Sequence, residues 1–283
     1  MGVVKALVAA GLVAAAYTSS AVAADLLPPP PPLASPAAVV APDFSGWYLR
    51  GDVGVGASFA PKSTSTFAPG LTPPGFGFYQ SDLADAAFVG LGVGYRFNSW
   101  LRFDVTGEYR GSAKYHAINA YGTTDASNTC SVGPRCFDVY HGMVKGGVLL
   151  ANAYVDLGTW AGVTPFVGVG LGGSMNRMTN FYDHNPTTGG FGIGITSTKY
   201  RFAWAVMAGL SYAVTQNVSL ELGYRYLDRG EGETRLACFQ GGACAGERQH
   251  YKVGSHDLRL GMRWMFADSY MPAPSPEPLV RKY

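Results

Sequence analysis

Strict alternation between apolar and polar residues constrains this chain more than any other feature of its sequence. Between Leu101 and Arg110 each odd position carries an apolar, aromatic or glycine residue, and each even position carries a polar one. The even positions are Arg102, Asp104, Thr106, Glu108 and Arg110. A period of two places successive side chains on opposite faces of a β-strand. This strand therefore has one charged face and one apolar face, which a soluble core does not easily accommodate.

Eight segments show this period, and none shows a convincing helical period. The expected strands cover residues 47–58, 86–97, 101–110, 144–157, 164–175, 200–214, 218–228 and 255–266. Most are longer than the ~5–6 residues of an ordinary strand. Their lengths suit a tilted strand that crosses the hydrocarbon of a bilayer, which takes ~9–11 residues.

The same two faces recur along the chain. Large apolar residues share one face, as Val167, Val169 and Leu171 do. The opposite face carries the charges Arg50, Asp52, Arg96, Arg102, Asp104, Glu108, Asp156, Glu221, Arg225, Asp257, Arg259 and Arg263. We therefore expect an all-β fold, an eight-stranded antiparallel transmembrane β-barrel with apolar residues facing lipid and charged residues facing the lumen.

The inward charges are expected to form ion pairs that fill the lumen. A charge taken out of water must be paired and hydrogen-bonded, and an eight-stranded barrel is only just wide enough for its own side chains. A structural plug is the favoured interpretation of these residues. A narrow pore or a gate is the alternative.

The connections between the expected strands alternate between short and long. Short connections cover residues 98–100, 158–163 and 215–217, and long ones cover 59–85, 111–143, 176–199 and 229–254. Outer-membrane barrels have short periplasmic turns and long external loops, with a girdle of aromatic residues at each interface. Trp47, Trp100 and Trp264 fall at the short-turn end, whereas Tyr109 and Tyr200 fall at the long-loop end. Both ends of an eight-stranded barrel then lie in the periplasm.

The N-terminal residues predict export. Lys5 precedes an apolar run from Ala6 to Tyr17, and the segment closes on Ala21-Val22-Ala23. This pattern is typical of a signal peptide cleaved after residue 23; a membrane anchor is the alternative, although the run is short for a spanning helix, which needs ~20 residues. The expected domains are the signal peptide at 1–23, a proline- and alanine-rich periplasmic linker at 24–43, the barrel at 44–266 and a proline-rich periplasmic tail at 267–283.

Four cysteines form two pairs with the same C-x5-C spacing, Cys130 with Cys136 and Cys238 with Cys244. An exported protein meets oxidising conditions, so disulfides are expected and these local pairs are favoured among three possible connectivities. Zinc is the alternative, but its usual motifs have closer spacing. We expect the two pairs to close small rings in the second and fourth long loops.

No residues point clearly to catalysis, a cofactor or a metal. Residues 168–173 satisfy G-x-G-x-x-G, but no helix follows them, as a dinucleotide site would require. Ser255-His256-Asp257 is the strongest cluster for a lipid-modifying hydrolase, yet adjacent strand residues point to opposite faces. The near-neutral charge, 21 basic against 19 acidic residues, suggests no nucleic-acid partner.

Several passages together resemble a known family. They are Asp43–Tyr48, Val89–Phe97, Asn152–Gly158, Thr164–Gly170 and Leu260–Phe266. As a set they resemble the Omp25/Omp31-like outer-membrane proteins of α-proteobacteria, within the OmpA/OmpX-type barrel superfamily. The resemblance implies a porin-like or opacity-type surface protein with roles in envelope integrity and host or surface contact, and no catalytic residues.

The resemblance also implies partners. The final aromatic strand, with Trp264 and Phe266, resembles the insertion signal read by the barrel assembly machinery, although most relatives end near that phenylalanine and this chain continues to Tyr283. Outer-membrane lipid, including lipopolysaccharide, and a surface or host ligand held by the external loops are the other expected partners. A small porin-like channel and a lipid A-modifying enzyme remain alternative functions.

Overall fold

The computed structural model describes residues 45–59, 61–122, 135–240 and 246–266, and every regular element within them is a β-strand. The strands are β1 (Gly46–Ser58), β2 (Ser63–Thr66), β3 (Gly77–Leu83), β4 (Ala86–Arg96), β5 (Leu101–Tyr121), β6 (Cys136–Asp156), β7 (Val163–His184), β8 (Phe191–Ile195), β9 (Ser197–Ala213), β10 (Val218–Gln240) and β11 (Arg248–Met265). Among these residues there is no helix long and apolar enough to cross a membrane. The expected signal peptide, linker and C-terminal tail lie outside the described residues.

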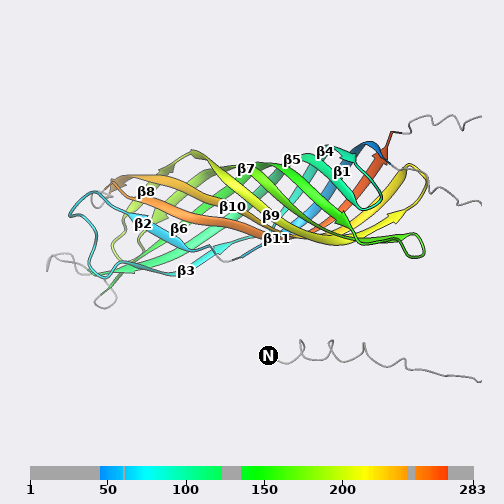
Figure 1. The fold of residues 1–283 in the computed structure, drawn as a ribbon. Helices are drawn as coiled ribbons and strands as arrows, with labels where there is room; N and C mark the ends of the chain where they lie inside the picture. Colours follow the sequence, from blue (N-terminus) through cyan, green and yellow to red (C-terminus); the bar gives the residue numbers. More distant parts are fainter. Residues whose placement is uncertain (1–44, 60, 123–134, 241–245, 267–283) are drawn as a thin grey trace, which may run out of the picture. The chain divides into compact units, whose positions relative to one another are not determined.

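Eight long strands close into a ring (Figure 1). Each pairs antiparallel with the next in the order β1, β4, β5, β6, β7, β9, β10 and β11. The ring is completed by β11 and β1, from Tyr48 opposite Met265 to Ser58 opposite Ser255. The prediction of an eight-stranded antiparallel barrel is therefore confirmed. The first residues of β1 and the last residues of β11 lie at the end of the barrel that carries the short turns.

The lower part of the ring has an apolar outer wall. Leu91 is 72% exposed, and exposed aliphatic residues continue around all eight strands at this level. Exposed tryptophans, among them Trp47, Trp160 and Trp264, lie at the short-turn end, and Tyr109 and Tyr200 lie at the opposite edge of the band. This is the lipid-facing surface that the alternation predicts, with aromatic residues at both interfaces.

The strands continue well beyond this apolar band. With 21 residues, about 3.3 Å per residue and a tilt of about 40°, β5 spans roughly 50 Å of barrel axis, about twice the ~25 Å of a transmembrane apolar band. We call the extension the upper tier; it comprises β2, β3, β8 and residues 111–121, 136–146, 174–184, 197–199, 229–240 and 248–254. The remainder of the ring is the lower tier.

Three short strands fill the places that shorter ring strands leave open in the upper tier. β2 pairs with β11, β3 pairs with β5, and β8 lies between β7 and β10. The interpretation of residues 59–85, 111–143, 176–199 and 229–254 as loops is therefore wrong for much of their length, because strands occupy large parts of each range.

Bulges explain why the sequence pattern seemed to stop. A β-bulge adds one residue to a strand, so the side chains beyond it change faces. In β5 the register shifts between Arg110 and Ala113, and inward positions change from even to odd. In β10 it shifts between Asp228 and Glu231, where Gly230 has a φ of 70°. Both bulges lie where the expected strands ended.

Candidate functional site: a charged lumen beneath an acidic upper tier

The lower lumen contains a continuous ion-pair network, which we call the lumen network. It consists of four arginines and four carboxylates, Arg50, Arg102, Arg259 and Arg263 with Asp52, Asp104, Asp156 and Glu221. All eight are almost fully buried, because they stand at the alternate positions of their strands whose side chains face the lumen. Equal numbers of the two charges make the network formally neutral, as burial requires.

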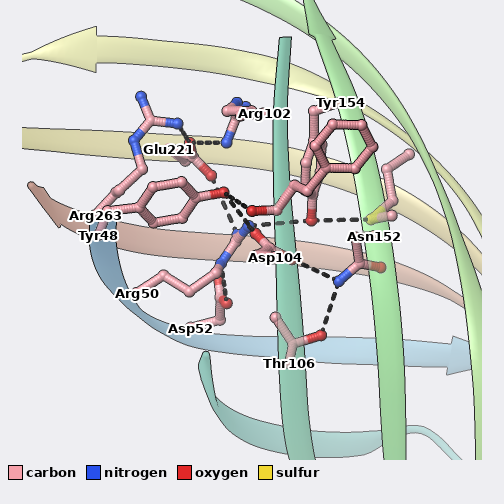
Figure 2. Close-up of polar contacts among 12 residues, drawn as sticks. Tyr48, Arg50, Asp52, Arg102, Asp104, Thr106, Asn152, Tyr154, Glu221 and Arg263 are labelled. Carbon is pink, nitrogen blue, oxygen red and sulfur yellow. Dashed lines mark hydrogen bonds and ion pairs between the residues drawn. The ribbon is translucent and has the colours of Figure 1, made fainter. Parts of the chain in front are cut away.

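Arg50 of β1 and Glu221 of β10 connect the network (Figure 2). The Arg50 guanidinium lies 2.9 Å from Asp52 Oδ2, 2.7 Å from Asp104 Oδ2 and 3.1 Å from Glu221 Oε2. Glu221 Oε1 also accepts hydrogen bonds from Arg102 Nη1 at 2.9 Å and from Arg263 Nη1 at 2.7 Å. Three arginines from three different strands thus converge on a single carboxylate.

Two further contacts extend the network to its edges. Arg102 Nε lies 3.1 Å from Asp156 Oδ1, and Arg259 Nε lies 3.6 Å from Asp52 Oδ1. Arg96, which was expected among the interior pairs, lies near the short turn and donates to the carbonyl oxygens of Asn98 and Ser99.

Neutral side chains complete the hydrogen bonding, and none of them was among the predicted ion-pair residues. The Tyr48 hydroxyl donates to Asp104 Oδ2 at 3.1 Å, and the Tyr154 hydroxyl accepts from Arg50 Nη1 at 3.0 Å. Asn152 Nδ2 donates to Asp104 Oδ1 at 2.7 Å (Figure 2). The alternation of the sequence places Asn152 on the inward face, and the same parity could also have identified Tyr48 and Tyr154.

A second charged cluster lies above the lumen network, near the top of the lower tier. Arg225 Nη2 is 2.7 Å from both Glu108 Oε2 and Asp257 Oδ2, and Arg110 Nη2 is 2.6 Å from Asp257 Oδ1. The Ser255 hydroxyl donates to the same Asp257 oxygen at 2.7 Å. Arg110 was not among the predicted site residues, although it continues the alternation that includes Glu108.

These contacts separate the residues considered for catalysis. Ser255 and Asp257 face the lumen, whereas His256 lies on the outer wall, where its Nδ1 is 2.7 Å from the Tyr224 hydroxyl. Residues 168–173 lie within β7 and not before a helix. Within the described ranges, no group of three or more histidine, cysteine, aspartate or glutamate residues is arranged to hold a metal ion.

The upper tier contains an apolar layer that the lower lumen lacks. Apolar and aromatic residues make up this layer, including Tyr115, Tyr140, Phe181 and Tyr251. The Tyr140 and Phe181 rings stack with centroids 5.8 Å apart, and those of Tyr115 and Tyr251 lie 5.4 Å apart. An apolar layer therefore covers the charged lumen.

An acidic group lies above this layer and consists of Asp138, Asp183 and Glu247. Glu247 Oε1 accepts hydrogen bonds from Ser65 at 2.6 Å and from Tyr140 at 3.1 Å. Burial raises the pKa of Glu247 to about 7, and the nearby Asp138 carboxylate adds to this effect. Burial likewise raises the pKa of Asp138 and Asp183, and the neighbouring carboxylates add to the increase at Asp183. These side chains therefore retain protons at pH values where ordinary carboxyls have lost them.

The remaining predicted residues are the four cysteines and the two aromatic residues of the expected insertion signal. Cys136 is buried at the start of β6 and is not a free thiol, but Cys130 and Cys244 lie outside the described residues and β10 is described only by its backbone at Cys238. Both disulfides therefore stay predictions. Trp264 and Phe266 are exposed at the short-turn end with ring centroids 5.6 Å apart. Their role in insertion also stays a prediction.

Comparison with known proteins places this geometry in a family. An uncharacterised protein of Brucella abortus (strain 2308) is 30% identical over 258 residues, covering 80% of this chain and 86% of its own length. A candidate adhesin of Rickettsia prowazekii (strain Madrid E) is 26% identical, covering 77% of this chain and 86% of its own. The outer membrane protein PagN of Salmonella typhimurium is 28% identical over 41% of this chain and 48% of its own.

The family model described as the outer membrane protein beta-barrel domain matches residues 8–266, which include all described strands. The apolar outer band, the closed eight-stranded ring and the two aromatic edges agree with this match. The chain therefore belongs to the outer membrane protein beta-barrel domain family, and its location is the cell outer membrane.

Proposed function

We propose that the protein acts at the cell surface through its long-loop end, as a contact protein with a supporting role in the envelope, and not as a channel or an enzyme. The observation that carries this proposal is the two-tier barrel. Strands continue past the lipid-facing band, and both tiers have lumens filled by side chains. The fold thus holds its loops away from the membrane on a rigid support.

The filled lumen argues against conduction. Arg102, Glu221 and Arg225 are at most 2% exposed, and their ion pairs reach across from different strands. A chain of such contacts restricts the passage of solutes because each buried charge would need a new partner before it could move. The apolar layer around Tyr140 and Phe181 is a second obstacle.

Relatives support a contact role. The Rickettsia prowazekii relative is described as a candidate adhesin, and this chain aligns with most of its length. The loop tips that would meet a ligand include the turn at residues 186–188, and the sequence ranges 123–134 and 241–245 belong to two other long connections. We propose a surface or host ligand for these loops.

The test is a loop-exchange experiment in the native host. Residues 123–134 and 241–245 are replaced by glycine-serine segments of equal length, and the short turn at 215–217 is changed in a matched control. We expect the loop variants to lose adhesion to host cells or matrix. The amount of protein at the cell surface and its mobility on unheated gels should stay unchanged. Adhesion equal to that of the wild type, or steps of conductance in planar bilayers, would contradict the proposal.

A further inference from the structure

Three basic residues form a row on the outer wall of the barrel, and we call them the basic row. They are Lys114 of β5, Lys145 of β6 and Arg177 of β7. Their neighbours Ala113, Val144 and Met178 are buried in the upper-tier lumen, so alternation directs all three basic side chains outward.

The basic row lies directly above the lipid-facing band. On β6, Lys145 is two residues above Gly147, which pairs with the interfacial Tyr109. On β7, Arg177 is two residues above Met175, which pairs with Tyr200. Two strand residues span about 7 Å. This distance places the positive charges at the level of the lipid headgroups.

No acidic residue neutralises the centre of the row. Lys145 and Arg177 lie directly opposite each other across β6 and β7, and like charges in such a pair destabilise a sheet. Their neighbours along the strands are Met143, Gly147, Met175 and Thr179. Among the described residues neither cation has an ion-pair partner.

The neighbouring strands differ at the same height. Lys199 of β9, opposite Asn176 of β7, has its Nζ 2.7 Å from Glu233 Oε2, and Arg248 Nη1 lies 3.5 Å from Glu233 Oε1. Lys199 and Arg248 are thus compensated within the protein, whereas Lys145 and Arg177 face each other without a carboxylate partner among the described residues.

We propose that the basic row binds the phosphate groups of a phosphorylated glycolipid in the outer leaflet. Phosphate oxygens would relieve the repulsion between Lys145 and Arg177, and Arg177 can bind a phosphate through two parallel hydrogen bonds. Basic residues near an anionic membrane surface contribute to lipid binding in this way. The site is independent of the loop contacts proposed above, because it lies on the outer wall at the level of the lipid headgroups and not at the loop tips.

The test compares two triple variants of the full chain in an uncharged detergent. The first is K114Q/K145Q/R177Q, and the matched control R235Q/R248Q/K252Q removes the same charge from the opposite wall. Binding of diphosphoryl lipid A and of dephosphorylated lipid A is measured by native mass spectrometry, after unheated gels establish that each variant is folded. We expect diphosphoryl lipid A to bind the first variant about 100-fold more weakly, at about a factor of five per basic residue.

The control variant is expected to bind diphosphoryl lipid A within about threefold of the wild type, and dephosphorylated lipid A should not distinguish the three proteins. An equal loss in both variants would overturn the proposal, because it would show a response to net charge alone. Unchanged lipid A binding in the first variant would also overturn it.

Discussion

Glu221→Gln is the substitution that most directly probes the lumen network. Glu221 is 2% exposed and accepts charged hydrogen bonds from Arg50, Arg102 and Arg263. After its charge is removed, Arg50 and Arg102 keep other carboxylates. Among the described residues Arg263 keeps none, and its remaining polar contact is the Ser211 hydroxyl at 3.5 Å. The variant therefore leaves a buried, unpaired cation.

The expected loss of unfolding free energy is about 3–5 kcal/mol, the cost of removing one partner from a buried ion pair. The double variant Glu221→Gln with Arg263→Met removes the unpaired cation and leaves three arginines with three carboxylates. We expect it to recover most of the stability, because removing both partners of a buried pair is often close to neutral. Glu233→Gln is the matched control, and its partly exposed position on the outer wall predicts a loss below about 1 kcal/mol.

The assay is urea unfolding in lipid vesicles, followed by tryptophan fluorescence and by mobility on unheated gels. With the single variant Arg263→Met added, the wild type, the two single variants and the double variant form a cycle whose coupling energy isolates the contact between Glu221 and Arg263. The reasoning is refuted if Glu221→Gln lies within about 1 kcal/mol of the wild type, or if the double variant is as unstable as the single one.

Three other perturbations test the upper tier and the packing of the wall. Burial raises the pKa of Glu247 to about 7, so the folded protein holds a proton that the unfolded chain has released, and stability falls as pH rises from about 4.5 to 7. Glu247→Gln should reduce this slope to the part that Asp138 and Asp183 supply, and should stabilise the upper tier against proteolysis at pH 8 by an amount on the order of 3 kcal/mol; a wild type without the slope would contradict it. Burial and two neighbouring histidines lower the pKa of His141, so acidification below about 6.5 should weaken the upper tier, and NMR titration should find His141 below its ordinary value and not above it. In Gly168→Ala the new methyl group would lie 2.5 Å from Tyr154 Cδ1, and a loss of about 1–3 kcal/mol in urea unfolding is expected, whereas the open site at Gly107 should accept alanine with little change.

The lumen contacts show how far pattern reading extends into the site. Parity alone identifies Arg102, Asp104 and Glu221 as inward residues, since the side-chain period of a strand is two. The choice of partners depends on the stagger between strands and on the diameter of the closed ring. Arg102 and Glu221 are 119 positions apart in sequence and meet only because β10 faces β5 across the lumen. A local sequence pattern cannot show a contact between residues so far apart in the chain.

Arg110 and Tyr115 show where pattern reading fails. They lie on either side of the β5 bulge, yet both side chains face the lumen although one position is even and the other odd. An alternation rule applied across the bulge assigns one of them to the wrong face. The environment also changes there, because the outer wall passes from lipid to water.

By itself, the sequence determined that this chain crosses the outer membrane as eight antiparallel strands with a charged lumen and an apolar outer wall. Strands with hydrocarbon outside and a narrow lumen inside must alternate apolar and polar side chains. This period of two is visible in the sequence. Only the tertiary structure decided that the barrel continues upward, with an apolar layer in its lumen. Bulges hide the continuing period, and β2, β3 and β8 find their places only against strands that are distant in the chain. Water around the upper tier permits polar residues on its outer wall and favours apolar packing within it. The same ring therefore faces lipid in its lower tier and water in its upper tier.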